Sequence, residues 1–194
     1  MSIQQDTLNQ LADQVQSALS GSEQFTMQLS AESSSFVRFN NAQVRQPGAV
    51  EQASIALRLI DGQRHTTTGL TLTGDAEMDR QQITEAVTRM RAQLPLLPED
   101  PRLLISDSAD SSVKDLSGNA KFDSEQVVSD ILAEAAGSDY VGILAAGDII
   151  SGFASSYGQR SWFQTRNFNL DWSLVHSADK AVKCSYAGQQ WSAD

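Results

Sequence analysis

Hydrophobic residues recur with a helical period near the start of the chain. Spacings of three and four residues place these side chains on one face of a helix. They are Leu8, Leu11, Ala12, Val15, Ala18 and Leu19. Ser2 with Gln5 resembles a capping box at the beginning of this segment, and Gly21 is a typical residue just after a helix end. We therefore predict an amphipathic helix between these two signals.

The helical period returns twice later in the chain. A second apolar face consists of Met78, Ile83, Ala86, Val87, Met90 and Leu94. Gly74 or Asp75 begins this helix, and Pro95 and Pro98 end it because proline has no backbone N–H to donate. A third apolar face consists of Val127, Val128, Ile131, Leu132 and Ala135. Asp123 with Gln126 is the expected capping box of this third helix.

Elsewhere the apolar period is two, which is typical of β-strands. The first run of strands covers 25–29, 36–39, a short strand at 44, 53–59 and 66–73, with turns at Asn40-Asn41 and Asp61-Gly62. The second run covers 141–150, 152–157, 162–163, 168–174 and 181–186. We expect about four or five strands in the first run. Because strands and helices occur in separate runs, we predict an α+β fold: two antiparallel β meanders with three amphipathic helices packed on them.

A long polar connection separates the second and third predicted helices. Residues 95–124 contain three of the four prolines and an acidic, serine-rich stretch from Ser106 to Asp115. This composition is typical of a surface connection, and the segment is our candidate for a mobile part of the chain. We interpret residues 1–194 as a single domain that includes this connection.

Charge and cysteine content exclude several classes of protein. The 194 residues carry a formal charge of −10, which repels nucleic-acid phosphates and anionic membranes, so we expect no direct nucleic-acid or membrane partner. The single cysteine, Cys184, has no second cysteine to pair with, and the amino terminus lacks the features of a signal peptide. We therefore expect a cytoplasmic protein in which Cys184, on an alternating strand, is a small buried hydrophobe.

The sequence contains no complete catalytic or metal-binding motif. Its two histidines, His65 and His176, do not form a pair at helical spacing, so we predict no metal site. Ser155-Ser156 lacks the glycine-flanked turn of a nucleophilic serine, and no glycine-rich phosphate loop occurs. We predict no catalytic residue, no metal ligand and no cofactor in this chain.

Two arginines lie within predicted strands, each between apolar neighbours. Strand alternation turns Arg38 and Arg58 to the face opposite those neighbours. Two interpretations remain open: the arginines mark the solvent face of the sheet, or they form a surface that receives a carboxylate.

Several segments resemble one family. Two segments carry this resemblance first: Ser35-Phe-Val-Arg-Phe-Asn-Asn-Ala-Gln-Val44 and Ala56-Leu-Arg-Leu-Ile-Asp-Gly-Gln-Arg64. Together they are similar to the amino-terminal region of the TldD/PmbA proteins, which are described as DNA gyrase modulators and zinc-dependent peptidases. Further segments follow in the order that this family shows: Tyr140–Leu144, Gly152–Gly158, and Asp179–Lys183 with Gly188. The resemblance implies an amino-terminal domain of an intracellular protein that forms a homodimer or a heterodimer with a paralogue.

The resemblance also implies a function in peptide handling. In peptidase-type relatives the zinc ligands belong to a His-Glu-x-x-x-His helix in a carboxy-terminal half, which would follow Asp194, so none is assigned here. Such relatives take an extended peptide or unfolded protein into a chamber. Arg38, Asn40, Arg58 and Tyr157 are the candidate peptide- or partner-binding residues of this chain.

Three hypotheses for function follow. The first is a non-catalytic amino-terminal domain of a TldD/PmbA-like metallopeptidase or gyrase modulator, which contributes to the peptide chamber and the dimer. The second is an independent acidic module that binds or regulates a basic protein partner and has no enzymatic activity. The third is a small hydrolase with a serine or cysteine nucleophile, since a spatial triad leaves no sequence signature.

Overall fold

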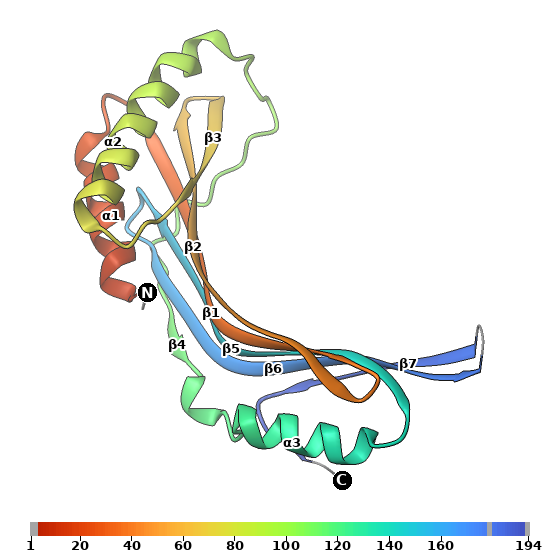
Figure 1. Ribbon diagram of the computed structural model, residues 1–194. Coiled ribbons are helices and arrows are strands. Elements are labelled where there is room, and N and C mark those ends of the chain that lie inside the picture. The colour runs from red at the N-terminus through yellow and green to blue at the C-terminus, as the bar shows by residue number, and fades with distance from the viewer. Residues whose placement is uncertain (1–3, 178–179, 193–194) are drawn as a thin grey trace. The chain divides into compact units, whose positions relative to one another are not determined.

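A computed structural model describes residues 4–177 and 180–192 (Figure 1). The helices are α1 (Gln5–Ala18), α2 (Ala76–Gln93) and α3 (Ser124–Ala135), with short 3-10 helices η1 (Leu94–Leu96) and η2 (Ser117–Asn119). The strands are β1 (Gln24–Asn40), β2 (Gln43–Asp61), β3 (Arg64–Thr71), β4 (Val113–Asp115), β5 (Asp139–Ser155), β6 (Arg160–Ser177) and β7 (Lys180–Gly188). The three predicted α-helices are confirmed. No helix among the described residues has the length and apolar character needed to cross a membrane.

The strands form one sheet. Its order is β3-β2-β1-β5-β6-β4, and β7 also pairs with β6. The strands β1, β2 and β3 are consecutive neighbours, and so are β5, β6 and β7, so the predicted α+β fold with two antiparallel meanders is confirmed. The pairing of β1 with β5 joins the two meanders into a single sheet. The sequence did not indicate this pairing.

The first meander contains three long strands, so the expected four or five was wrong. The predicted strands at 25–29 and 36–39 are both part of β1, which continues through the polar residues between them. At Gly147 of β5 this polar stretch passes so close that a Cβ there would collide with backbone atoms of Ser33 and Ser34. The polar stretch is therefore held against a neighbouring strand at close range, and its small side chains permit that approach.

The turns and helix ends follow local chemistry. In the β1–β2 turn Asn41 and Ala42 have φ of 51° and 54°, so the turn lies one residue later than Asn40-Asn41. Asp123 caps α3 by accepting a hydrogen bond from the backbone N–H of Gln126 at 2.9 Å, as predicted. The Gln126 side chain donates to Asp130 Oδ1, so the reciprocal half of the expected capping box is absent. The cap position of α1 is Gln4, which makes no side-chain cap, and Ser2 of the expected capping box lies outside the described residues.

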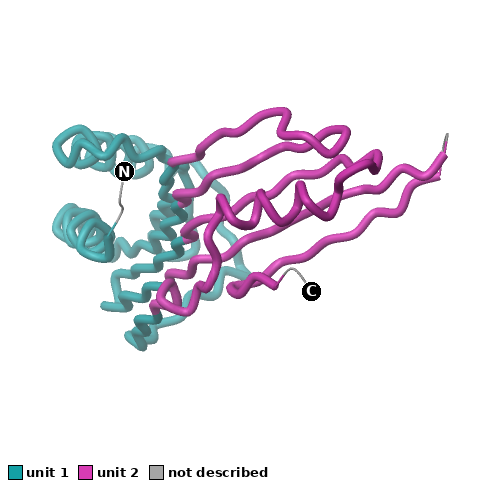
Figure 2. The backbone as a smooth tube through the Cα atoms, turned by 60° about the horizontal axis from the view of Figure 1, so that its bottom comes forward, with its two compact units in different colours: residues 1–31, 52–114, 150–163 teal, residues 32–51, 115–149, 164–194 magenta. Residues whose placement is uncertain are grey.

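The described chain divides into two compact units (Figure 2). Unit 1 contains the described residues of 1–31, 52–114 and 150–163, and unit 2 contains those of 32–51, 115–149 and 164–194. Each unit has its own hydrophobic cluster. The interpretation of 1–194 as one domain stays a prediction.

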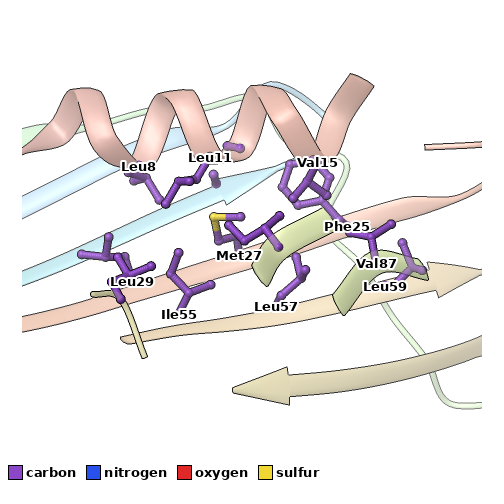
Figure 3. Packing of buried hydrophobic residues seen from close by; sticks show 14 of the residues in the cluster. Leu8, Leu11, Val15, Phe25, Met27, Leu29, Ile55, Leu57, Leu59 and Val87 are labelled. Carbon is purple, nitrogen blue, oxygen red and sulfur yellow. The ribbon is translucent and has the colours of Figure 1, made fainter. Parts of the chain in front are cut away.

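In unit 1, α1 and α2 pack on alternate residues of β1 and β2. The buried contacts include Leu8, Leu11, Val15, Phe25, Met27, Leu29, Ile55, Leu57, Leu59 and Val87 (Figure 3). Met78 was predicted on the buried face of α2, but 54% of its side chain is exposed, and Asp79 is buried in its place. The helical period places Asp79, four residues before Ile83, on the buried face and turns Met78 away from it. Asp79 Oδ1 accepts hydrogen bonds from the backbone N–H and the hydroxyl of Thr73, which satisfy the buried carboxylate.

In unit 2, α3 covers one face of the sheet. Val127, Ile131 and Ala135 of this helix pack against the alternate buried residues Phe39, Tyr140, Leu144, Phe168 and Leu170. Because α3 is the only α-helix of unit 2 in the described part of the chain, the opposite sheet face carries no helix. Cys184 of β7 is exposed, so its predicted burial was wrong.

The connection at 95–124 contributes a strand to the sheet. Residues after η1 run without regular structure to β4, which lies beside β6. The backbone N–H of Trp162 donates to Ser112 O at 2.8 Å, and that of Leu116 donates to Gln164 O at 2.8 Å. Residues 112–116 of the connection are therefore tied to the sheet, while the mobility of the connection stays a prediction.

The close approach at Gly147 predicts a strong effect of a single methyl group. Gly147→Ala should lower the free energy of unfolding by about 1–3 kcal/mol, because backbone atoms of Ser33 and Ser34 must move. The matched control is Gly69→Ala on β3, where nothing lies within 4 Å of a Cβ, and we expect a change of less than about 0.5 kcal/mol. Urea unfolding followed by circular dichroism measures both, and equal effects would contradict the close approach.

The pair Glu23–Arg91 in unit 1 predicts a pH-dependent stability. The Glu23 carboxylate accepts hydrogen bonds from Arg91 Nε and Nη2, both at 2.6 Å, and these bonds hold its pKa below the ordinary value. A carboxyl whose folded-state pKa is lowered stabilises the fold above its unfolded-state pKa, and this stabilisation is lost as the pH falls through the folded-state pKa. Glu23→Gln should therefore cost about 1–2 kcal/mol at pH 7 and much less at pH 3.

Unfolding midpoints in urea at the two pH values measure this difference. The control is Glu85→Gln, which removes an exposed carboxylate 3.8 Å from Arg89 and should change stability by about 0.5 kcal/mol or less. A cost of Glu23→Gln that stayed constant between pH 7 and pH 3 would show that the Arg91 contact does not set the ionisation of this carboxyl.

Candidate functional site

A pocket of about 500 Å³ lies in unit 2. Its walls come from five strands, β2, β1, β5, β6 and β7. The lining residues are Arg38, Phe39, Asn40, Arg45, Gln46, Val141, Gly142, Ile143, Asp171, Trp172, Ser173 and Lys183. We call this the open-face pocket, because most of these side chains belong to the sheet face that α3 does not cover.

Strand alternation places the polar residues on that face. Phe39 is buried against the α3 side, so its neighbours Arg38 and Asn40 project to the opposite side. Leu170 is buried in the same way, which turns Asp171 to the open face. Lys183 of β7 pairs with Ser173 of β6, and both line the pocket.

The open-face pocket is basic although the whole chain is acidic. Three of its side chains, Arg38, Arg45 and Lys183, are cationic and one, Asp171, is anionic. No ion pair among residues 4–177 and 180–192 involves any of the three cations. The Arg38 guanidinium lies 5.7 Å from the centroid of the Phe36 ring, a contact that orients it without neutralising its charge. The pocket therefore offers a net positive charge to an anionic group.

Neutral groups complete the pocket. Asn40, Gln46 and Ser173 supply amide and hydroxyl groups, and Val141 and Ile143 supply an apolar strip along β5, with Val141 41% exposed. Amides can bond to a main chain in either direction because they both donate and accept. The set contains no histidine, cysteine or paired carboxylates, so it has the chemistry of binding and lacks a general acid–base pair.

Two of the four predicted binding residues lie in this pocket. Arg38 and Asn40 line it, whereas Arg58 and Tyr157 belong to unit 1. Arg58 Nε donates to the Thr67 hydroxyl at 3.4 Å, and the Tyr157 hydroxyl accepts from Gln24 Nε2 at 2.5 Å. The structure therefore does not bring all four residues into one pocket, and the role of Arg58 and Tyr157 stays a prediction.

Sequence reasoning missed Arg45 and Lys183. Arg45 could have been found, because Arg38 and Arg45 are equally distant along the chain from the turn residues Asn41 and Ala42. Lys183 could not have been found from the sequence, because its position in the pocket depends on the pairing of β7 with β6 and of β5 with β1.

The described residues offer no donor set for the zinc ion of peptidase-type relatives. No group of three or more histidine, cysteine, aspartate or glutamate side chains lies close enough to hold a metal within residues 4–177 and 180–192. His65 Nε2 lies 3.5 Å from Asp100 Oδ2, and His176 is exposed near the end of β6. Zinc therefore does not fit the residues present.

Comparison with known proteins identifies the fold. No family model and no curated protein matches the sequence. Among solved structures, TldE from Thermococcus kodakarensis matches with a TM-score of 0.69 and 8% identity, covering 95% of this chain and 43% of that protein. The chain shares the fold of the matched part of this protein.

Two further structures support the same conclusion. Proteins described as proposed modulators of DNA gyrase, from Thermotoga maritima and Bacteroides thetaiotaomicron, each match with a TM-score of 0.62, at 9% and 14% identity. They cover 95% and 94% of this chain, and the chain spans 43% of each of them. The resemblance to the TldD/PmbA proteins is therefore confirmed at the level of the fold, over less than half the length of these relatives.

Proposed function

We propose that this chain is a non-catalytic, peptide-binding domain of a TldD/PmbA-like protein. The observation that carries the proposal is the fold match, which covers nearly the whole chain but only 43% of TldE and of the gyrase modulators. In this proposal the domain shapes a chamber for an extended peptide or unfolded protein in a cytoplasmic homodimer or paralogous heterodimer. Hydrolysis, where a full-length relative performs it, belongs to residues outside this domain.

The open-face pocket supports the binding part of the proposal. An extended peptide that crosses a sheet face meets several strands at once, and this pocket draws its lining from five. Arg38, Arg45 and Lys183 favour an acidic segment or a terminal carboxylate, since guanidinium groups bind carboxylates with two parallel hydrogen bonds. The negative charge of the remaining chain repels acidic peptides from other surfaces, so binding is directed to this face.

Fluorescence anisotropy tests this function with three labelled, unstructured peptides of equal length. One peptide is acidic, one is neutral and one is basic. We expect the acidic peptide to bind best, with an affinity that falls as salt rises. The double variant Arg38→Gln/Arg45→Gln should weaken its binding about five- to thirtyfold, because exposed charge pairs contribute about 0.5–1 kcal/mol each. Arg89→Gln, on the exposed surface of α2, is the matched control and should bind as the unchanged protein does.

Mass spectrometry of the same mixtures tests the non-catalytic part. The peptides should remain intact after incubation with the chain, with and without added zinc. Tightest binding of the basic peptide, or equal effects of the double variant and Arg89→Gln, would rule out the open-face pocket as the peptide site. Cleavage that disappeared in His65→Ala/His176→Ala would rule out a non-catalytic role.

A further inference from the structure

A second pocket, of about 310 Å³, lies on the other face of the same part of the sheet. It is bordered by α3, by β5, β6 and β7, and by the segment after β7, all in unit 2. Its lining residues are Asp130, Ile131, Glu134, Ala135, Tyr140, Leu170, Trp172, Leu174, Tyr186, Trp191 and Ser192. We call it the aromatic pocket, because four of these side chains are aromatic rings. Its volume is at the lower end of the range for small-molecule sites.

The aromatic rings are held in place by packing and hydrogen bonds. Tyr186 and Trp191 lie 5.4 Å apart between centroids, and the buried ring of Phe168 contacts both edge-on, at 5.1 and 5.3 Å. The Tyr186 hydroxyl donates to Gln190 O at 3.1 Å, and the Trp191 indole N–H donates to Asp130 Oδ2 at 2.9 Å. Both rings are half-buried, so they leave part of their surface open to a ligand.

The ionic groups of the aromatic pocket are all negative. Asp130 and Glu134 are four residues apart on α3 and therefore lie on the same side of the helix. Asp130 accepts hydrogen bonds only from the neutral groups of Trp191 and Gln126, and no cation pairs with either carboxylate within the described ranges. No lysine, arginine or histidine lines the pocket. Two like charges four residues apart destabilise a helix, and a bound cation would relieve this repulsion.

Tyr140 adds a polar group without a partner. Its side chain lines the pocket and is 5% exposed, and its hydroxyl is buried with no hydrogen-bond partner among the described residues. Burial raises the pKa of Tyr140 to about 12, so the hydroxyl is neutral at physiological pH. A buried hydroxyl without a partner is costly, and a ligand N–H would satisfy its oxygen.

We propose that the aromatic pocket binds an organic cation, an ammonium or guanidinium group attached to an apolar body. The aromatic faces attract the positive charge, Asp130 and Glu134 neutralise it, and Ile131, Leu170 and Leu174 contact the apolar part. An anion would meet two carboxylates, and a neutral apolar ligand would leave those charges uncompensated. The proposal does not depend on the peptide-binding function, because the open-face pocket carries the opposite charge.

Isothermal titration calorimetry with three ligands of similar shape tests the preference for charge. These are 2-phenylethylammonium, neutral 2-phenylethanol and anionic 3-phenylpropanoate. We expect the cation to bind at least about tenfold more tightly than the alcohol, since a cation–π contact combined with a charge contact contributes on the order of 1.4 kcal/mol. The anion should show no binding. Equal binding of the three ligands, or preference for the anion, would overturn the proposal.

Two conservative variants assign the effect to named residues. Glu134→Gln should weaken the cation about three- to tenfold and leave 2-phenylethanol unchanged, because only the charge is removed. The matched control is Glu125→Gln, an exposed glutamate on the same helix that does not line the pocket. Equal effects of Glu134→Gln and Glu125→Gln would overturn the assignment to this pocket.

Tyr140→Phe tests the unpaired hydroxyl. It should weaken the cation by a similar factor and leave the fold intact, because the hydroxyl makes no bond to a described residue. Circular dichroism of each variant confirms the fold. Cation binding that was unaffected by both Tyr140→Phe and Glu134→Gln would contradict the site.

A further titration distinguishes a free small molecule from a protein side chain as the source of the cation. An acetylated and amidated Gly-Lys-Gly peptide carries the same ammonium group on a protein-like side chain. Binding of 2-phenylethylammonium alone assigns the pocket to a free small molecule. Binding of the peptide as well, weakened by Glu134→Gln, assigns it to a lysine side chain of a partner protein.

Discussion

The pairing of β1 with β5 is the contact on which the rest of the structure depends. Each meander alone would present an unpaired edge, and the two edges satisfy their backbone groups by pairing with each other. The approach is close enough at Gly147 that no side chain fits against Ser33 and Ser34. Because this pairing places β5, β6 and β7 beside β1 and β2, it brings Arg38 and Lys183 to the same face, although 145 positions separate them in the sequence. A sheet interrupted there would lose the open-face pocket altogether.

Local signals in the sequence were sufficient for the helices and for most of the strands. The capping residue Asp123 and the turn at Gly62 act within a few residues, so their effect can be predicted without knowledge of the fold. The continuous strand through Ser33 and Ser34 could not be predicted, because the polar residues there show no apolar period and their partner strand β5 is distant in the sequence. Met78 was misplaced for a different reason: the helical period places Asp79, four residues before Ile83, on the buried face. Thr73 satisfies that buried carboxylate by donating two hydrogen bonds, which a pattern of apolar residues does not register.

The candidate site shows the same division between local and distant information. Strand alternation correctly turned Arg38 away from its apolar neighbours, and the hairpin brought Arg45 to it. The net charge of −10 did not indicate this basic pocket, because a sum over the chain contains no information on where the charges lie. The alternation that sends Arg38 and Asp171 to one face sends Tyr140 and Leu170 to the other, where the carboxylates of α3 lie. One sheet thus separates a basic pocket from an acidic, aromatic one.

The two pockets share a wall at Trp172, and this limits how each can be perturbed separately. Trp172 lines both, so any change of that ring alters the basic and the acidic side together. Arg45 projects only into the open-face pocket and Glu134 only into the aromatic one. If an acidic peptide and an organic cation occupy their pockets independently, Arg45→Gln should affect only the peptide and Glu134→Gln only the cation. The open-face pocket contains no residue of α3. If a substitution in one pocket changed binding in the other, the change would therefore have to be transmitted through the single layer of sheet that carries Trp172.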